Sequence, residues 1–318
     1  MASKKERVTV IYPLYNPNIE FLAKSLKSLV KDDADIIKDM ILVDDGSQNP
    51  VMNYTNDLQD IFPRIKIIRQ ENKGAAGARN TGLDLAKTDV VAFLDWDCVP
   101  HRGWLKIITT PILENQAVAT GGKTLTYKDF NIFSDFSDFR KALREPVRDS
   151  NGDIIIIITA NAAFSKKVLD CVGKFDTKFR KAGGEDLDLT YRLTEAGYSD
   201  RMLYVPSAVV EHLHRSNLVS FLKQQFNYGF WDMFHFVYRG RNPMVMGVRF
   251  PTPLNILRQI KDIVTFSIGL IPTVPRSYGF LKKYLLFPLI AFSRRFAVML
   301  GGIKCYYFYA PKVLKEKG

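Results

Sequence analysis

The fold of this chain is decided by residues 90–97, which read VVAFLDWD. The first five of these residues are apolar and mostly β-branched or aromatic, as in a buried strand. Asp95 and Asp97 follow at once, and because acids are disfavoured inside strands, the strand is expected to end at Leu94. Ligands of open α/β sheets bind beyond the carboxyl ends of the strands, so this strand end is a candidate site.

Apolar runs like this one recur outward along the chain and alternate with segments of helical spacing. Strands that alternate with helices predict βαβ units, and hence an α/β fold with a mostly parallel sheet flanked by helices. Five consecutive isoleucines favour a central strand within residues 153–159. The expected strands are residues 8–12, 40–43, 65–68, 90–94, 153–159 and 201–205, and the expected helices are residues 19–30, a segment ending at 85, and residues 185–196.

Charge is distributed unevenly over the 318 residues, which carry a net charge of +12. Residues 1–200 are nearly neutral, with 28 Lys and Arg against 29 Asp and Glu, whereas residues 201–318 hold 17 against four. This asymmetry predicts an anionic partner for the last third of the chain, either a membrane or a nucleic acid. The alternative is a basic surface without a partner.

The compartment is expected to be reducing, because the three cysteines have the spacing of neither a zinc site nor a disulfide framework. The first seven residues show no signal-peptide core. These features predict a cytoplasmic protein.

Asp95 and Asp97 form a D-x-D pair whose spacing directs both carboxylates to one side of an extended backbone. A divalent cation relieves the repulsion between two such anions, and Mg²⁺ or Mn²⁺ suits oxygen ligands when phosphates complete the shell. The alternative is a solvated turn. Further polar clusters follow other apolar runs and support a shared site: Tyr15-Asn16, Asp44-Asp45-Gly46-Ser47, Asn72-Lys73-Gly74, Arg79 and Gly184-Glu185-Asp186.

These motifs, in this order and spacing over roughly residues 7–215, resemble family 2 glycosyltransferases of the GT-A fold, which are inverting enzymes. The resemblance implies a catalytic domain over residues 1–215, with the nucleotide sugar bound by roughly residues 7–125 and the acceptor and base region at roughly 126–215. A basic, aromatic-rich and amphipathic helical extension is expected over residues 216–318.

The resemblance also implies the roles of individual residues. Asp186 would be the base that deprotonates the acceptor hydroxyl, with Glu185 beside it, although acids at a helix start also complement the helix dipole. Asp97 would chelate Mn²⁺ or Mg²⁺, and Asp95 would reach the metal or the ribose. The nucleotide would be bound by Pro13, Tyr15 (stacking on the base), Asn16, Asp44, Asp45 (hydrogen-bonding the base), Lys73, Gly74, Arg79, Asp95 and Trp96.

A histidine is a further candidate metal ligand. His214 is preferred, His212 is the alternative, and a hydrogen-bonded surface pair is the plain reading. Processive relatives carry a Q-x-x-R-W motif, whereas residues 224–228 read QQFNY, so transfer of a single sugar is expected.

The basic last third contains no uncharged apolar run of about 18 residues, so its amphipathic segments are expected to lie on a membrane surface. Alternatively, its aromatic side chains pack on the catalytic domain. The expected partners are a nucleotide-sugar donor (UDP-sugar foremost), a lipid-linked or growing glycan acceptor and the anionic inner face of the cell membrane. Two rival classes are a catalytically silent binding protein on the same fold and a nucleic-acid-binding protein. The second lacks a recognition module.

Overall fold

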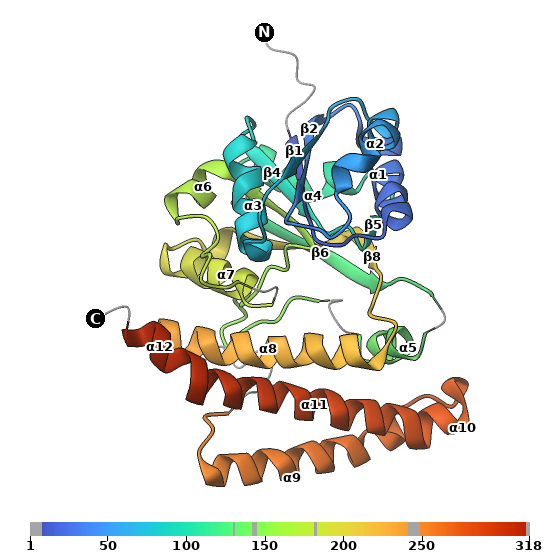
Figure 1. The fold of residues 1–318 in the computed structure, drawn as a ribbon, viewed down its shortest axis with the longest axis vertical. Helices are drawn as coiled ribbons and strands as arrows, with labels where there is room; N and C mark the ends of the chain where they lie inside the picture. The colour runs from blue at the N-terminus through green and yellow to red at the C-terminus, as the bar shows by residue number, and fades with distance from the viewer. Residues whose placement is uncertain (1–7, 130, 142–144, 181–182, 241–248, 316–318) are drawn as a thin grey trace. The chain divides into compact units, whose positions relative to one another are not determined.

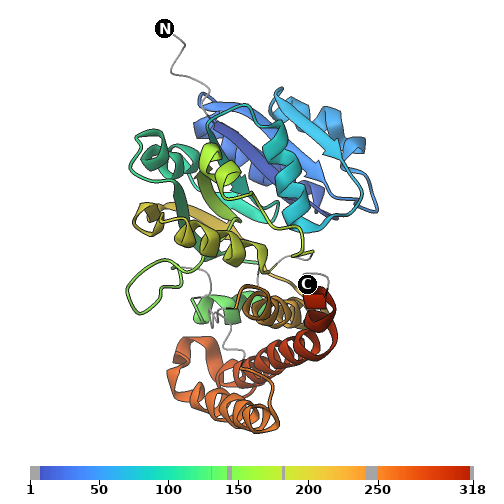
Figure 2. The ribbon, with the colours of Figure 1, turned by 90° about the vertical axis from the view of Figure 1, so that its left-hand side faces the viewer.

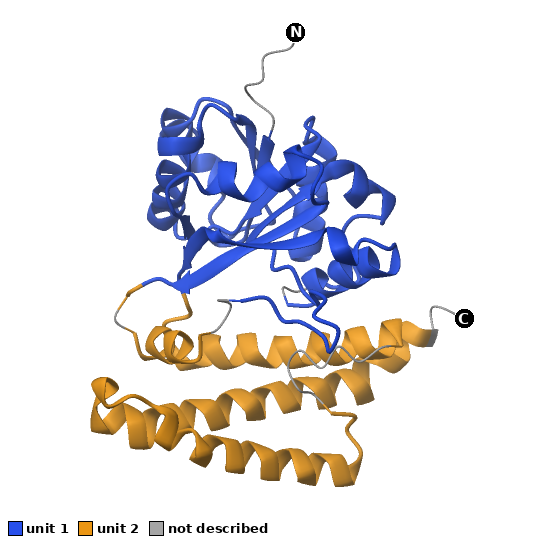
Figure 3. Ribbon diagram, turned by 180° about the vertical axis from the view of Figure 1, so that it is seen from behind, with its two compact units in different colours: residues 1–127, 142–213 blue, residues 128–141, 214–318 orange. Residues whose placement is uncertain are grey.

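A computed structural model of the chain describes residues 8–129, 131–141, 145–180, 183–240 and 249–315. The N-terminal residues inspected above for a leader lie outside these ranges. The chain divides into two compact units, coloured separately in Figure 3. Unit 1 comprises residues 1–127 and 142–213, and unit 2 comprises residues 128–141 and 214–318. The single boundary predicted from the sequence lies near residue 215, whereas unit 2 also contains residues 128–141.

Unit 1 is built on one eight-stranded sheet with the order β3-β2-β1-β4-β7-β6-β8-β5. Strands β1, β2, β3 and β4 pair in parallel, while β7 and β5 run antiparallel to their neighbours and β6 pairs with β8 in parallel. The strands are β1 (Val8–Leu14), β2 (Ile37–Asp44), β3 (Ile65–Arg69), β4 (Val90–Leu94), β5 (Cys98–Pro100), β6 (Ala119–Thr126), β7 (Asn161–Ser165) and β8 (Met202–His212). The α/β class with a mostly parallel sheet is confirmed.

Helices cover both faces of this sheet (Figures 1 and 2). Alternate residues of β1 point to opposite faces, as the strand period of two requires. Val10 and Tyr12 join one core cluster with α1, α2 and α4, and Ile11 joins a second with α3, α6 and α7. The helices are α1 (Ile19–Asp33), α2 (Thr55–Ile61), α3 (Gly74–Leu85), α4 (Trp104–Leu113), α6 (Lys166–Cys171) and α7 (Glu185–Glu195).

The isoleucine run was predicted as a central strand, and that prediction is wrong. In this segment the structure has only an isolated bridge, between Arg148 and Ile154, and the central position between β4 and β6 belongs to β7. Ile154 and Ile157 are nevertheless buried in the second core cluster. The apolar run therefore predicted buried side chains correctly, but it did not predict the backbone conformation. Apolar side chains of a loop can fill a core as well as those of a strand.

Unit 2 is helical. Its core consists of side chains from α5, α8 and α11 with the turn after α9, among them Phe136, Phe221, Val274 and Phe287. Helix α8 approaches α11 closely: a Cβ on Gly229 would lie 1.9 Å from the carbonyl oxygen of Val298. The helices are α5 (Ile132–Phe139), α8 (Leu218–Arg239), α9 (Pro253–Gly269), α10 (Gly279–Leu281), α11 (Phe287–Lys304) and α12 (Ala310–Lys315), with π-helical turns at Lys282–Leu286 and Cys305–Tyr309.

Within the described part of the chain, one helix, Lys282–Leu314, is long and apolar enough to cross a membrane by length and composition. The sequence prediction counted only uncharged runs and missed it, because Arg294 and Arg295 interrupt the apolar stretch. In the structure 44% of an apolar window of 18 residues in this helix is buried inside the protein. Core helices of soluble proteins can have the same length and composition.

Candidate functional site

Asp44 organises the loop that follows β2. Its carboxylate is fully buried and accepts hydrogen bonds from the backbone nitrogens of Ser47 (2.9 Å) and Val51 (3.1 Å). Arg69 at the end of β3 donates to it from Nη1 at 2.8 Å. Burial by itself raises the pKa of Asp44, but the hydrogen bonds and the charge of Arg69 outweigh burial, so the pKa lies below its ordinary value. Through these hydrogen bonds the buried Asp44 side chain fixes the conformation of the loop that follows β2.

Asp45 connects the end of β2 to the start of α3. Its carboxylate accepts hydrogen bonds from the backbone nitrogens of Lys73 and Gly74, both at 2.8 Å, and from Gln70 Nε2 at 2.6 Å. Gly74 is required because its φ is +80° and a Cβ would lie 2.0 Å from the carbonyl oxygen of Arg180. A carboxylate has about four acceptor sites, so these three donors leave room for one more. The Lys73 side chain is exposed.

Tyr15 and Asn16 follow β1 and lie beside the loop of β2. Asn16 has a left-handed backbone with φ of +47° and donates from its nitrogen to Ser47 Oγ at 2.9 Å. Its side-chain oxygen accepts from the backbone nitrogen of Gln48 at 2.8 Å. The Tyr15 side chain is 52% exposed, and Pro13 is partly buried within β1. The exposed ring of Tyr15 therefore lies in a loop that is fixed by hydrogen bonds at the carboxyl ends of the parallel strands.

Arg79 on α3 is surrounded by carboxylates. Its Nη1 donates to Glu185 Oε1 at 2.8 Å and its Nη2 donates to Asp95 Oδ1 at 3.0 Å, and the arginine side chain is only 4% exposed. Burial lowers the pKa of this guanidinium, but the charges of Asp95, Asp186 and Glu185 outweigh burial and raise it. Arg79 was predicted from the sequence to bind the nucleotide. In the structure, its two terminal nitrogens join the end of β4 to the start of α7.

Glu185 and Asp186 open α7 but have different surroundings. Glu185 is 2% exposed, and its Oε2 accepts from the backbone nitrogens of Gly183 (2.8 Å) and Gly184 (3.0 Å) while its Oε1 binds Arg79. Both oxygens of Glu185 are thus engaged inside unit 1. Asp186 is partly exposed.

The Asp186 carboxylate is held by Thr159, which donates from Oγ1 to Oδ1 at 2.6 Å and from its backbone nitrogen to Oδ2 at 3.1 Å. Burial, then the charge of Glu185, raises the pKa of Asp186 to about 7, against the opposing effects of Arg79 and the Thr159 hydrogen bonds. A carboxylate that gains and loses a proton near neutral pH is suited to general base chemistry.

The D-x-D motif forms a turn, because the backbone nitrogen of Cys98 donates to the carbonyl of Asp95 at 3.0 Å. The expectation of an extended backbone at this motif is therefore wrong. As a result Asp95 and Asp97 have different partners, Arg79 for the former and the end of β8 for the latter. Trp96 between them is partly buried and packs against the first core cluster.

Asp97, Cys98 and His212 bring three ligand atoms within 4.8 Å of one another. His212 Nε2 lies 3.6 Å from Asp97 Oδ1, and Cys98 Sγ lies 4.0 Å from the same oxygen. Cys98 is fully buried among core side chains, and burial raises the pKa of its thiol well above the usual range. Asp97 and His212 are therefore the pair suited to a hard divalent cation. His214, the histidine preferred from sequence, begins unit 2.

The predicted residues of unit 1 lie at the carboxyl ends of β1, β2 and β4 and at the starts of α3 and α7. Hydrogen bonds join Asp45 to Lys73 and Gly74, and Arg79 to Asp95 and Glu185. Two residues that contact these side chains, Gln70 and Thr159, were not predicted from the sequence. Gln70 follows β3 directly, so its place at a strand end was the signal that pointed to it. Thr159 follows the misassigned isoleucine run, and no local pattern marks it.

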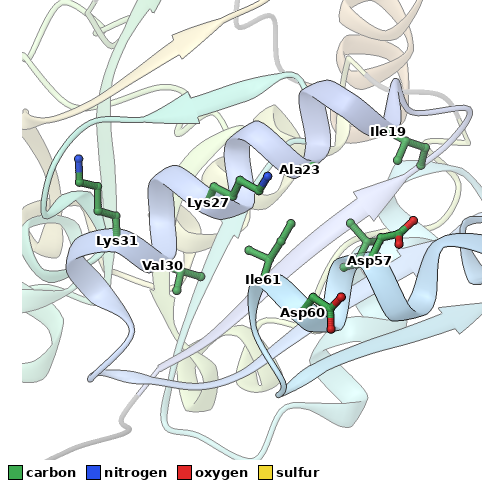
Figure 4. A pocket seen from close by; sticks show the side chains of 9 residues that line it. Ile19, Ala23, Lys27, Val30, Lys31, Asp57, Asp60 and Ile61 are labelled. Atoms are coloured by element: carbon green, nitrogen blue, oxygen red, sulfur yellow. The ribbon is translucent and has the colours of Figure 1, made fainter.

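A cavity of about 420 Å³ lies elsewhere in unit 1, between α1 and α2 (Figure 4). None of the predicted site residues lines it. Its lining is mixed, with Lys27 and Lys31 on α1, Asp57 and Asp60 on α2, and apolar side chains between them.

Comparison with protein families matches residues 9–173 to the model described as glycosyl transferase family 2. Pre-mycofactocin glycosyltransferase of Mycobacterium tuberculosis is 30% identical over 230 residues, covering 70% of this chain and 46% of that protein. Glycosyltransferase AglE of Haloferax volcanii is 29% identical over 204 residues, covering 63% of this chain and 65% of that protein. The chain therefore spans about half to two thirds of the length of these relatives.

Among solved structures, the chain is similar to a mannosyltransferase from Pyrobaculum calidifontis in complex with GDP-Man and Mn²⁺. The superposition has a TM-score of 0.59 at 16% identity and covers 96% of this chain and 88% of the other. At this identity the likeness establishes the fold.

Proposed function

This chain belongs to glycosyltransferase family 2 and has the GT-A fold, and from this premise we propose that it transfers a single sugar with inversion from a nucleoside diphosphate sugar to a lipid-linked or growing glycan. Glycosyl transfer is the activity of the family. The observation that carries the finer proposal is the environment of Asp186, whose pKa is raised to about 7 beside the buried Arg79 and Glu185 pair.

In this proposal Asp186 is the catalytic base. It accepts the proton of the acceptor hydroxyl as the acceptor oxygen bonds to the anomeric carbon, and the bond from that carbon to the diphosphate oxygen breaks on the opposite face. The nucleoside diphosphate leaves, and the anomeric configuration inverts. Thr159 positions the base through two hydrogen bonds, and Arg79 limits the rise of its pKa. A positioned base contributes about 10²–10⁴-fold to such a step.

Glu185 supports this arrangement as a positioning residue. With Arg79 and two backbone nitrogens as partners, it has no oxygen directed to a substrate. Arg79 in turn acts on the donor through Asp95, the first residue of the D-x-D turn, to which it donates a hydrogen bond.

Asp97 and His212 are the residues that we propose hold Mn²⁺ or Mg²⁺. One carboxylate oxygen and one imidazole nitrogen 3.6 Å apart fit such a cation, with diphosphate oxygens completing its shell. When bound, the cation would stabilise the negative charge of the leaving diphosphate. The Mn²⁺ in the Pyrobaculum mannosyltransferase supports this choice.

For the nucleotide we propose that the exposed Tyr15 ring stacks on the base and that Asp45 accepts a hydrogen bond from it, using the acceptor site that its three protein donors leave. Asn16 and Asp44 fix the loops after β1 and β2 through their hydrogen bonds, and Pro13 lies within β1 just before Tyr15. Lys73, Gly74 and Trp96 would flank the ribose and phosphates. Uridine is the proposed base, and guanosine is the alternative that the GDP-Man of the Pyrobaculum enzyme suggests.

Unit 2 is proposed to dock on the inner face of the cell membrane. Two helices carry exposed apolar side chains at helical spacing, and the excess of basic residues in this part of the chain matches an anionic leaflet, where each contributes about 1 kcal/mol. The exposed side chains are Leu254, Leu257, Val264 and Ile268 on α9 and Leu289, Phe292, Phe296 and Leu300 on α11.

Two measurements test the proposal. Thermal unfolding with a panel of nucleotide sugars and Mn²⁺ identifies the donor, because a ligand of the folded state raises the melting temperature. UDP-sugars are expected to give the largest rise in melting temperature, and this rise should disappear in Asp97→Ala.

The docking of unit 2 is tested by flotation, in which the full chain should float with vesicles that contain anionic lipid. Failure to float would contradict the proposed membrane docking and would not affect the assignment of the donor.

A further inference from the structure

Gln70 connects the end of β2 to α3 through its side-chain amide. It follows β3 directly, and its Nε2 donates to Asp45 Oδ1 at 2.6 Å. Its Oε1 accepts a hydrogen bond from Thr81 Oγ1 on α3, also at 2.6 Å. The amide of Gln70 therefore lies between a carboxylate at the end of β2 and a hydroxyl group on α3.

These two contacts fix which end of the amide faces Asp45. An ionised carboxylate only accepts hydrogen bonds, whereas a hydroxyl group can donate or accept. Exchange of the two amide ends would place Gln70 Oε1 against Asp45 Oδ1 with no proton between them, and unpaired acceptors away from water are costly. Asp45 thus selects the nitrogen end, and Thr81 completes the arrangement by donating to the oxygen end.

Asp45 and Gln70 each keep one unused hydrogen-bonding position. Among the residues that the structure describes, Asp45 Oδ1 accepts from Gln70 and from the backbone nitrogen of Lys73, and Oδ2 accepts from the backbone nitrogen of Gly74. The open acceptor position of the carboxylate is therefore on Oδ2. Gln70 Nε2 carries two N–H bonds, and within the described ranges only the one directed to Asp45 has a partner. Asp45 is 3% exposed and Gln70 is partly exposed, so the amide offers the wider access.

An open acceptor beside an open donor is complementary to an N–H group beside a carbonyl. Uracil, thymine and guanine have this lactam pattern on the edge that pairs with other bases. Cytosine and adenine have the reverse pattern, in which a ring nitrogen accepts and the neighbouring amino group donates. Placed against Asp45 and Gln70, the reverse pattern would bring acceptor to acceptor and donor to donor. A binding site rejects such a ligand strongly, because its polar groups stay unpaired.

We propose that Gln70 is a specificity-determining residue of the donor site. Its open N–H donates to the base carbonyl beside the ring N–H that Asp45 binds, and Thr81 is the residue that positions it. The site would thereby select donors with a lactam base, such as UDP-sugars or GDP-sugars, over cytidine and adenosine donors. This inference rests on the donor site proposed above and names the base chemistry that the site recognises.

Calorimetric titration of the full chain with UDP, GDP, CDP and ADP at saturating Mn²⁺ measures the selectivity. UDP or GDP is expected to bind at least about tenfold more tightly than CDP and ADP. Gln70→Leu should raise Kd for the preferred nucleotide about tenfold, because a hydrogen bond to the base is lost, so its preference over CDP should narrow.

The matched control is Gln116→Leu. Gln116 Nε2 also donates to a carboxylate, Glu114 Oε2 at 3.1 Å, but both residues lie on the exposed surface after α4. This variant should leave Kd for every nucleotide within about twofold, because it removes no contact to the donor site. A loss of affinity equal to that of Gln70→Leu would overturn the proposal.

Thio analogues separate a direct contact of Gln70 from a purely structural role. Both 2-thio-UDP and 4-thio-UDP keep the ring N–H and replace one carbonyl oxygen by sulfur, a weaker acceptor, and 6-thio-GDP takes their place if GDP is preferred. One analogue should bind the unmodified chain about three- to tenfold more weakly than its parent nucleotide, and this difference should disappear in Gln70→Leu. The same difference in both proteins, or none in the unmodified chain, would overturn the direct contact.

Thr81 is tested by a pair of variants. Thr81→Val removes the partner of Gln70 Oε1 and should raise Kd for the preferred nucleotide about three- to tenfold. Thr81→Ser keeps the hydroxyl group and should bind like the unmodified chain, and thermal unfolding without ligand checks that all variants are folded. Equal affinity for all four nucleotides would overturn the selectivity and leave the donor site in place, whereas absence of binding by all four would contradict the donor site itself.

Discussion

Thr159 donates two hydrogen bonds to Asp186, one from its hydroxyl to Oδ1 at 2.6 Å and one from its backbone nitrogen to Oδ2 at 3.1 Å. The two residues belong to a loop before β7 and to the first turn of α7. Both oxygens of the carboxylate are oriented by this contact, while the side chain stays partly exposed. Position and protonation of the proposed base are thereby linked to one threonine.

The transfer rate should rise with pH around neutrality. The base acts in its deprotonated form, and the pKa of Asp186 is about 7, so kcat/KM is expected to increase from about pH 6 to about pH 8 and then to level off. The charged groups that face Asp186 are Glu185, which raises its pKa, and Arg79, which lowers it. Initial rates over this range with saturating metal measure the profile. A rate that is constant over the whole range would contradict the assignment.

Thr159→Val should displace this profile to higher pH. The hydroxyl hydrogen bond stabilises the charged form of Asp186, so its loss raises the pKa of the carboxyl by roughly one unit. Thr159→Ser retains a hydroxyl and serves as the control, with a midpoint close to that of the unmodified chain. If both variants gave the same midpoint, the hydrogen bond would have no part in tuning the base.

Asp186→Asn should lower the transfer rate, whereas Glu185→Gln should lower the stability of the fold. Asp186→Asn removes the base, so transfer is expected to fall about 10²–10⁴-fold with donor affinity unchanged. Glu185→Gln breaks a buried ion pair with Arg79 and is expected to destabilise the fold by about 3–5 kcal/mol. Single-turnover rates and thermal unfolding separate the two effects. A stable Glu185→Gln protein with the rate loss of Asp186→Asn would exchange the two roles.

His212→Ala should weaken metal-dependent nucleotide binding more than His214→Ala does. His212 Nε2 lies 3.6 Å from Asp97, and the pair belongs to the only group of three ligand atoms found within the described ranges. Removal of one ligand is expected to raise the apparent dissociation constant for Mn²⁺ at least about tenfold. Titration of nucleotide binding with Mn²⁺ measures it, and a larger effect in His214→Ala would restore the preference drawn from sequence.

Gly301→Ala should destabilise unit 2. A Cβ on Gly301 would lie 2.0 Å from the carbonyl oxygen of Phe226 on α8, so α8 and α11 would have to separate. Overpacking of this kind costs about 1–3 kcal/mol. Gly269→Ala at the end of α9 is the control, because a Cβ there meets nothing within 4 Å. Thermal unfolding should show a lower melting temperature for the first variant alone.

Much of unit 1 was predictable from local pattern. The runs at β1, β2, β3 and β4 are apolar and end in polar residues, and parallel strands bring those ends to one edge. The positions of Tyr15, Asp45 and Asp95 after strands were therefore predictable from the sequence. The isoleucine run misled because apolar composition reports burial, and burial is compatible with both a strand and a loop.

The partners of these residues were not predictable, because they come from distant parts of the chain. Arg79 binds Glu185 across 106 residues and Asp186 meets Thr159 across 27. Likewise, Arg140 joins Arg295 at Phe266 only because a segment from the middle of the chain packs in unit 2. Composition showed that the last third of the chain has an excess of basic residues, but it did not predict where these residues lie in the folded protein.

The amino-acid sequence by itself determined the class of fold, the strand ends that carry polar side chains and the family to which the chain belongs. These depend on neighbouring residues, whose periodicity and turn chemistry are local. Only the tertiary structure decided which acid is enclosed by Arg79 and which stays accessible beside Thr159. Burial and electrostatic environment are set by groups far apart in the chain, so the difference between Glu185 and Asp186, adjacent and chemically alike, exists only in the folded protein.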